Sequence, residues 1–270
     1  MNYDYTYLLE EINQLENVFT IGKTSGGRDI FCIPLGNGET TAVFAGAFHG
    51  LEYLTTYALI DFAHKFSETP FTNSFRLFII PMVNPDGVDI AINGINPKNS
   101  LHHKLIDNVG IISFTKKWQA NSNGVDINHN FDAAWQPILD NPSASKFGGK
   151  NPESELETQA IANFLRLTEP TLFIAFHSQG KEIYYDFNNM ENKSSKEIAE
   201  KVAQKFGYTA VHPKGTAGFG GAKDWYIKEY HKQAFTIELG KGTNPLPHSQ
   251  LEEMKKDTYN ICMEFLGNIF

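Results

Sequence analysis

The chain has 270 residues, of which 41% are hydrophobic and 13% aromatic, so it is long enough and apolar enough to bury a sizeable core. Its formal net charge of −8 argues against a nucleic-acid or anionic-membrane partner, because both attract a basic surface. It contains two cysteines, which excludes a disulfide framework and a cysteine-based zinc site.

The first half of the chain shows helical spacing followed by continuous apolar runs. Continuous runs are typical of strands that are buried on both faces of a sheet. The patterns predict, in chain order, a helix over 5–16, two short strands within 18–35, a strand over 41–48, a helix over 52–66 and a strand over 75–83. The sequence Asn-Pro-Asp-Gly that follows is typical of a turn and ends the last of these strands.

The second half begins with a long segment rich in Asn, Gly, Ser and Pro, residues 93–152, which favours a functional surface. The elements predicted after it are a helix over 153–167, strands over 171–177 and 182–187, a helix over 194–206, a flexible turn over 215–221, a short helix ending near 230, a strand over 233–239 and a helix over 248–266. Strands that alternate with helices predict an α/β fold with a mixed, mostly parallel twisted sheet flanked by helices. No linker is visible, so residues 1–270 are expected to form a single domain.

Four polar residues occur at or near the ends of these apolar strands. His49 follows one strand, Glu52 lies three residues later, His177 ends a second strand, and Glu238 lies inside a third. Ligand sites in open α/β sheets collect at the carboxyl ends of strands, and two histidines with one glutamate are a known zinc-ligand set. A histidine at a strand end is also often a hydrogen-bonded structural residue, so the spacing leaves both interpretations open.

Five motifs occur in the order and spacing of the zinc carboxypeptidase family, the carboxypeptidase A-like metallopeptidases. They are GAFHGLEY, MVNPDG, NGVDINHNF, FIAFHSQG and FTIELG. Longer segments resemble one bacterial branch, the γ-D-glutamyl-meso-diaminopimelate peptidases, which cleave the bond between D-glutamate and the diamino acid of peptidoglycan stem peptides. These segments are KKWQANSNGVDINHNFDAAW, HSQGKEIYY and GGAKDWYIKEYHKQAFTIELGKGTNPLP.

The resemblance implies a role for each matching residue. It implies one zinc ion per chain, held by His49, Glu52 and His177. Glu238 matches the catalytic glutamate of the family. The resemblance further implies that Asp126 orients the first histidine and that Asn128 contacts the carboxylate of the substrate.

The chain departs from the family at the residues that bind the substrate's carboxylate. Arginines in ordinary members are replaced here by Leu51 and His129, and Gln119 is the closest match to the arginine that also backs the oxyanion; Thr216 stands roughly where a tyrosine of a mobile loop is expected. The whole chain has three arginines, none of them near these motifs, so the usual clamp cannot be rebuilt from arginine. Gln119, His129 and Thr216 remain the candidate substrate-binding residues at these positions.

Lys223 occupies a position that resembles the specificity determinant at the base of the family's primary pocket. A lysine there suits an acidic group on the leaving residue, and meso-diaminopimelate carries a second carboxylate on its side chain. The alternative is a solvated lysine at the start of a helix.

The expected function is zinc-dependent hydrolysis of the γ-D-glutamyl–diamino acid bond, with a small murein peptide as partner and neither nucleic acid nor membrane. The alternatives are a carboxypeptidase on ordinary peptides, an N-acyl amino acid deacylase of the same fold, and a zinc-dead module that binds cell-wall peptides. The chain has no run of about 18 apolar residues, and its acidic start lacks the features of a secretory signal. A cytoplasmic protein is therefore expected, unless the chain is a trimmed secreted protein.

Overall fold

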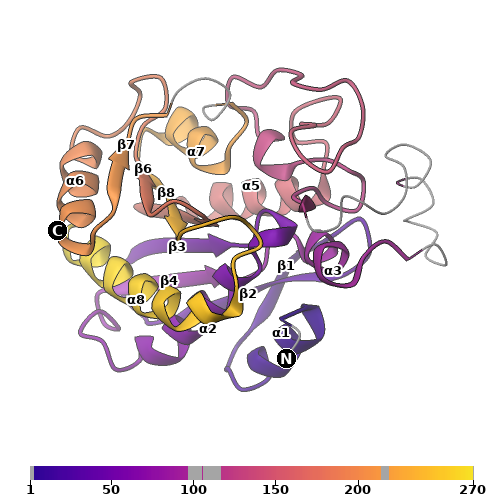
Figure 1. Ribbon diagram of the computed structural model, residues 1–270. Helices are drawn as coiled ribbons and strands as arrows, with labels where there is room; N and C mark the ends of the chain where they lie inside the picture. Colours follow the sequence, from indigo (N-terminus) through magenta and orange to yellow (C-terminus); the bar gives the residue numbers. More distant parts are fainter. Residues whose placement is uncertain (1–2, 97–104, 106–116, 214–218, 270) are drawn as a thin grey trace.

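An eight-stranded sheet runs through the middle of the molecule (Figure 1). The computed structural model describes residues 3–96, 105, 117–213 and 219–269. The strands are β1 (Phe19–Lys23), β2 (Asp29–Leu35), β3 (Thr40–Gly46), β4 (Phe75–Ile80), β5 (Leu172–Ser178), β6 (Glu182–Tyr184), β7 (Thr209–Val211) and β8 (Gln233–Leu239). Their order across the sheet is β1-β2-β4-β3-β5-β8-β6-β7. The α/β fold with a mixed sheet is therefore confirmed.

The centre of the sheet is parallel and its edges contain the antiparallel pairs. β4, β3, β5 and β8 run parallel to one another, whereas β2 pairs antiparallel to β4 and β6 antiparallel to β8. All seven residues of β5 are buried, which explains why its sequence is a continuous apolar run rather than an alternating one. The four parallel strands therefore bring their carboxyl ends to the same edge of the sheet.

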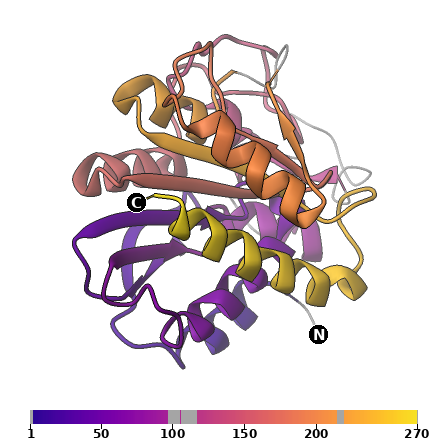
Figure 2. The ribbon, with the colours of Figure 1, turned by 90° about the vertical axis from the view of Figure 1, so that its left-hand side faces the viewer.

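Helices cover both faces of the sheet, as the two views show (Figures 1 and 2). The helices are α1 (Tyr5–Ile12), α2 (Leu54–Phe66), α3 (Pro85–Asn93), α5 (Leu156–Thr168), α6 (Ser195–Phe206), α7 (Ala222–Tyr230) and α8 (Leu251–Gly267). Helices α1, α2, α6 and α8 share one apolar core with one face of the sheet, and α5 and α7 share the second core on the opposite face. Within the described ranges, no helix is both long and apolar enough to cross a membrane.

The structure differs from the prediction made from the sequence at several element boundaries, and it contains one strand that was not predicted. The segment expected to be a turn after β4 starts helix α3 instead, because Asn84 caps it by accepting a hydrogen bond from the Gly87 amide at 2.9 Å and Pro85 is the first helical residue. The first helix ends at Ile12 rather than at residue 16, and β4 ends at Ile80 rather than at residue 83. The short edge strand β7 had not been expected.

Candidate metal centre

The parallel strands bring the four predicted polar residues, His49, Glu52, His177 and Glu238, together at one edge of the sheet. β3 ends three residues before His49, and a 3₁₀ turn over Gly50–Glu52 then carries Glu52 back toward the sheet. His177 and Glu238 are direct neighbours across the β5–β8 pair. Residues that are 125 positions apart in sequence, Glu52 and His177, are thereby in hydrogen-bond contact.

Two histidines converge on the carboxylate of Glu52. Nδ1 of His49 lies 2.9 Å from Oε1 of Glu52, and Nδ1 of His177 lies 2.9 Å from Oε2. The candidate ligand atoms of these three residues all lie within 4.8 Å of one another. Tetrahedral zinc with bonds of about 2.0–2.2 Å spaces its ligand atoms about 3.3–3.6 Å apart, so a small adjustment of the side chains accommodates the ion.

Asp126 fixes the orientation of the first histidine. Its Oδ1 lies 3.1 Å from Nε2 of His49, and its Oδ2 accepts a hydrogen bond from the Lys146 amide at 2.9 Å. A neutral His49 that donates from Nε2 to Asp126 presents a lone pair at Nδ1, which faces another acceptor, Glu52. A proton or a metal cation must therefore lie between them, and the donor set fits a divalent ion. Metal binding in place of that proton releases it.

The electrostatics of Glu52 and His177 agree with metal binding. Burial lowers the pKa of His49, but the charges of Glu52 and Asp126 outweigh burial and raise it well above its usual range, so a metal must displace a proton from His49. Burial opposes ionisation of Glu52, but the positive charge of His49 and the hydrogen bonds of both histidines lower its pKa to about 2, so it is a carboxylate. Burial lowers the pKa of His177, which keeps its imidazole neutral and able to donate a lone pair. The ring of Phe48 stacks on His177 with centroids 5.2 Å apart, which restricts the imidazole's rotation.

Asn244 and Ser178 make further contacts with Glu52, and the sequence did not predict them. The amide of Asn244 lies 3.4 Å from Oε1 of Glu52, and the backbone N–H of Ser178 donates to Oε2 at 3.3 Å. The hydroxyl of Ser178 donates to Asn244 at 2.9 Å, so the two residues support each other. Asn244 lies 192 positions from Glu52, in a loop after β8, and nothing in the local sequence pattern signalled the contact.

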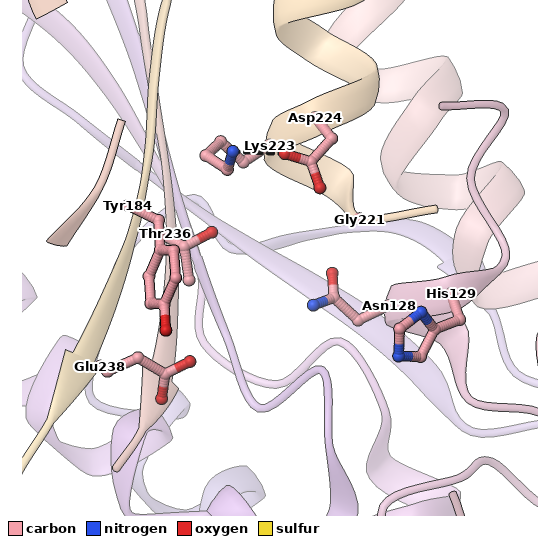
Figure 3. A pocket seen from close by; sticks show the side chains of 8 residues that line it. All are labelled: Asn128, His129, Tyr184, Gly221, Lys223, Asp224, Thr236 and Glu238. Carbon is pink, nitrogen blue, oxygen red and sulfur yellow. Dashed lines mark hydrogen bonds and ion pairs between the residues drawn. The ribbon is translucent and has the colours of Figure 1, made fainter. Parts of the chain in front are cut away.

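A pocket of about 550 Å³, including its open mouth, lies beside Glu238 (Figure 3). We call it the primary pocket. Its lining combines one face of β8, a tyrosine of β6, the start of α7 and the 3₁₀ turn that follows Asp126: Asn128, His129, Tyr184, Gly221, Lys223, Asp224, Thr236 and Glu238. Asn128, His129 and Lys223, predicted to bind substrate, thus share one pocket with the predicted catalytic residue.

Glu238 has the environment of a proton-transfer group. Burial raises its pKa well above the usual range, and the nearby negative charge of Glu52 raises it further, whereas His49 acts in the opposite direction. Glu182 lies directly across from it in the β6–β8 pair and adds to the upward shift. A carboxyl group with a raised pKa in a cleft is a candidate acid and base.

Lys223 lines the primary pocket but is not a solvated lysine. Its side chain is buried, and its Nζ donates hydrogen bonds to the backbone oxygen of Asp186, at 2.5 Å, and to the carboxylate of Asp224. Its positive charge therefore lies against the negative charge of Asp224. Recognition of an acidic group by Lys223 stays a prediction.

The remaining predicted substrate residues lie elsewhere. Gln119 lines a second cavity, together with Leu51, Lys117, Ser145, Gln179, Gly242, Thr243 and Asn244. Thr216 lies outside the described residues. Arg28 pairs with Asp86 and Asp89, and Arg166 pairs with Glu153, so neither reaches the primary pocket.

The sequence profile of the family described as zinc carboxypeptidase matches residues 3–261. The chain belongs to this family. The zinc carboxypeptidases are zinc-dependent peptidases, and the triad of His49, Glu52 and His177 is a group that can hold one ion in this member. The chain is accordingly a zinc metallopeptidase, and the intact triad with Glu238 beside it argues against a zinc-dead binding module.

Comparison with individual zinc carboxypeptidases and solved structures adds detail. A curated relative, gamma-D-glutamyl-L-diamino acid endopeptidase 1 of Lysinibacillus sphaericus, is 32% identical over 295 residues, covering 100% of this chain and 72% of that protein. The structure of bovine thrombin-activatable fibrinolysis inhibitor in complex with tick carboxypeptidase inhibitor superimposes with a TM-score of 0.77 at 18% identity, covering 98% of this chain and 95% of that one. Murein-tripeptide amidase MpaA from Escherichia coli O157 superimposes with a TM-score of 0.63 at 20% identity, covering 90% of each chain. The two structural likenesses show the fold.

Proposed function

We propose that this zinc carboxypeptidase hydrolyses the bond between the γ-carboxyl group of D-glutamate and the amino group of a diamino acid in murein peptides. The observation that carries the proposal is the 32% identity, over the whole of this chain, to a protein named for that activity on L-diamino acids. The site supports the proposal, because a group that can hold a metal ion lies close to Glu238, a candidate proton-transfer residue that lines a pocket with polar walls.

The composition of the primary pocket disfavours a carboxypeptidase of the common kind. The resemblance to the family leads us to expect arginines around the terminal carboxylate, but in the described part of the chain no arginine lines the primary pocket or the cavity that contains Gln119. Asn128 uses its Oδ1 to accept a hydrogen bond from the Ala222 amide at 3.2 Å, which leaves its NH₂ group facing the pocket (Figure 3). In the proposed complex this NH₂ group donates to a carboxylate of the diamino acid.

In the proposed hydrolysis, the zinc ion and the side chains around it have different roles. Zinc, when bound by the triad, supplies a Lewis acid that polarises the scissile carbonyl. Glu238 takes a proton from the attacking water and delivers it to the leaving amine, which its raised pKa suits it to hold. Asp126 keeps His49 in the tautomer that presents Nδ1 to the ion, since its Oδ1 binds the Nε2 side of the ring.

The test uses the zinc-loaded full chain and four substrates whose products are read by mass spectrometry. They are L-Ala-γ-D-Glu-meso-diaminopimelate, its α-linked isomer, hippuryl-phenylalanine and an N-succinyl amino acid. We expect release of diaminopimelate from the γ-linked tripeptide alone, and loss of that release in Glu238→Gln. Efficient cleavage of hippuryl-phenylalanine would favour an ordinary carboxypeptidase, and cleavage of the N-succinyl compound a deacylase; either, without γ-glutamyl cleavage, overturns the proposal.

A further inference from the structure

The turn over residues 47–52 carries His49 and Glu52, two of the three residues that can hold the metal ion, and we call it the ligand turn. We propose that Thr55 and Asn84 are positioning residues of the metal centre, because their side chains hold the ligand turn in the shape that presents both ligands. Neither residue belongs to the triad itself. This role in metal binding is independent of the peptide that the enzyme cleaves.

The ligand turn begins with a residue in an unfavourable backbone conformation. Ala47 has a φ of 49°, in the left-handed region that residues other than glycine rarely adopt. This bend follows the end of β3 and leads the chain into His49 and the 3₁₀ turn that ends at Glu52. Such a conformation persists only where the surrounding structure holds it. The contacts that hold Ala47 therefore determine how the two ligands are presented.

The hydroxyl group of Thr55 joins the start of the ligand turn to its end. It accepts a hydrogen bond from the Ala47 N–H at 2.9 Å and donates one to the Glu52 carbonyl at 2.9 Å. Thr55 lies in the first turn of α2 and is fully buried, so solvent cannot replace either partner. One hydroxyl group thus fixes two backbone groups that lie on either side of His49 in the sequence.

Asn84 holds the same turn from a different segment of the chain. Its backbone N–H donates to the Ala47 carbonyl at 3.0 Å, and its side-chain NH₂ group donates to the Phe48 carbonyl at 3.0 Å. Its Oδ1 atom is used separately, to cap helix α3. Both polar groups of the Ala47 backbone are therefore bonded, and so is the carbonyl directly before His49.

The ligand turn is also packed tightly against the backbone of neighbouring segments. A Cβ atom at Gly50 would lie 2.3 Å from the Gly87 carbonyl oxygen, so no side chain fits at this position. The Gly50 N–H donates to the Gln119 carbonyl at 3.0 Å, and the NH₂ group of Asn84 donates to the same carbonyl at 3.3 Å. Asn84 therefore links the ligand turn to the segment that carries Gln119.

A turn that is already ordered binds a metal ion without an ordering cost. If the Thr55 hydroxyl is removed, the Ala47 N–H loses its partner, and the left-handed bend is free to relax in the metal-free chain. The bend must then be ordered again when His49 and Glu52 bind the ion. Ordering one backbone residue in this way corresponds to roughly a tenfold loss of affinity.

The first test measures the zinc Kd of the metal-free full chain by competition with a chelator. Thr55→Val replaces the hydroxyl by a methyl group, and we expect the Kd to rise by about tenfold. Thr55→Ser keeps a hydroxyl and should hold the Kd within about threefold of wild type. Thr56→Val is the matched control and should leave the Kd unchanged. Thr56 is buried on the same helix, and its hydroxyl has no hydrogen-bond partner in the described ranges.

The second test separates the two roles of Asn84. Asn84→Asp keeps an oxygen that can cap α3 but places an acceptor where the NH₂ group faced the Phe48 and Gln119 carbonyls. We expect this variant to raise the zinc Kd by about tenfold or more. Asn192→Asp, at an asparagine whose Oδ1 accepts from the Ser194 N–H before α6, is the control and should keep the wild-type Kd.

Zinc affinity distinguishes positioning from a purely structural role. A residue that only stabilises the fold lowers the urea midpoint of the metal-free chain but leaves the Kd of the folded chain unchanged. A folded Thr55→Val or Asn84→Asp chain whose Kd stays within about threefold of wild type overturns the role of that residue. An equal rise in Thr56→Val, or a failure of Thr55→Ser to keep the affinity, overturns the role of the hydroxyl.

Discussion

Replacing Asp126 by Asn should weaken zinc binding, although the two side chains have nearly the same shape. Asp126 is 1% exposed and accepts two hydrogen bonds, from His49 Nε2 at 3.1 Å and from the Lys146 amide at 2.9 Å. Burial opposes its ionisation, but the charge and hydrogen bond of His49 outweigh burial and lower its pKa below the usual range. Its carboxylate is therefore the form that the site requires.

An asparagine has one acceptor oxygen where two donors must be satisfied. If the oxygen faces Lys146, the amide NH₂ faces His49 and favours the tautomer whose Nδ1 carries a proton and cannot bind metal. If the oxygen faces His49, the NH₂ opposes the Lys146 N–H and a buried donor is left unsatisfied, at about 1–3 kcal/mol. Loss of such a supporting carboxylate typically weakens metal affinity about 10–100-fold, which equals about 1.4–2.7 kcal/mol.

The assay is a zinc titration of the metal-free chain against a competing chelator at constant pH. We expect Asp126→Asn to raise the zinc Kd by about 10–100-fold, and Asp132→Asn, at an exposed aspartate that pairs with Lys228, to leave it unchanged. Circular dichroism confirms that each variant is folded. A folded Asp126→Asn chain whose Kd stays within threefold of wild type would refute the role assigned to Asp126.

Three further predictions follow from the site and the core. Glu238→Gln should reduce kcat by about 10²–10⁴-fold or more while zinc content stays at one per chain. Burial raises the pKa of Glu157 to about 7, so the folded chain holds a proton that the unfolded chain releases near pH 4.5. The stabilisation of the folded chain by this bound proton is complete below pH 4.5 and is lost as the pH rises through 7. Urea unfolding should therefore show Glu157→Gln gaining stability over wild type by up to about 3 kcal/mol from pH 5 to pH 8. Phe44→Ala should lower the free energy of unfolding by about 3–5 kcal/mol, because Phe44 is fully buried between α2 and β5.

Each of these three predictions has a result that would contradict it, and a control variant where the chain offers one. Glu169→Gln, at an exposed glutamate, should keep full activity, and near-normal turnover by Glu238→Gln would require a different base. A Glu157→Gln difference that stays constant from pH 5 to pH 8 would contradict the raised pKa. Phe19→Ala, at a ring that is 39% exposed, should lose less than Phe44→Ala, and equal losses would contradict the packing argument.

The sequence was most informative where burial leaves a strong pattern. β5 is buried along its whole length and β3 over its last five residues, so each is a continuous apolar run that stands out in the sequence. β4 and β8 are also mostly apolar, although Arg76 of β4 is exposed. The triad was predictable for a related reason, because parallel strands align their carboxyl ends and so bring His49, Glu52 and His177 together. The assignment of zinc and of Glu238 depended on the family resemblance as well as on spacing.

The sequence was least informative where a single capping side chain decides the local structure, or where two residues in contact are far apart along the chain. Asn84, Pro85 and Gly87 are typical of a turn and equally of a helix start, and the cap made by Asn84 decides for the helix. Asn244 supports Glu52 from a distant loop, which only the folded chain reveals.

The ion pair of Lys223 and Asp224 in the primary pocket was not predicted, for a different reason. Lys223 and Asp224 are adjacent in sequence, and neighbouring residues on a regular helix do not face each other, so their pairing was not expected. They lie at the first turn of α7, after the N-cap Gly221, where both side chains reach the same cavity. The charge of the pocket therefore had to be corrected from a single cation to a pair.

The most direct test of the account is a competition in one tube between L-Ala-γ-D-Glu-meso-diaminopimelate and its α-linked isomer, incubated with the zinc-loaded chain and followed by mass spectrometry. The two peptides have the same mass and charges, so isotopic labelling of one of them identifies the source of each product. The account predicts that diaminopimelate is released from the γ-linked peptide while the α-linked peptide stays intact. Release from the α-linked peptide at an equal or higher rate would contradict it.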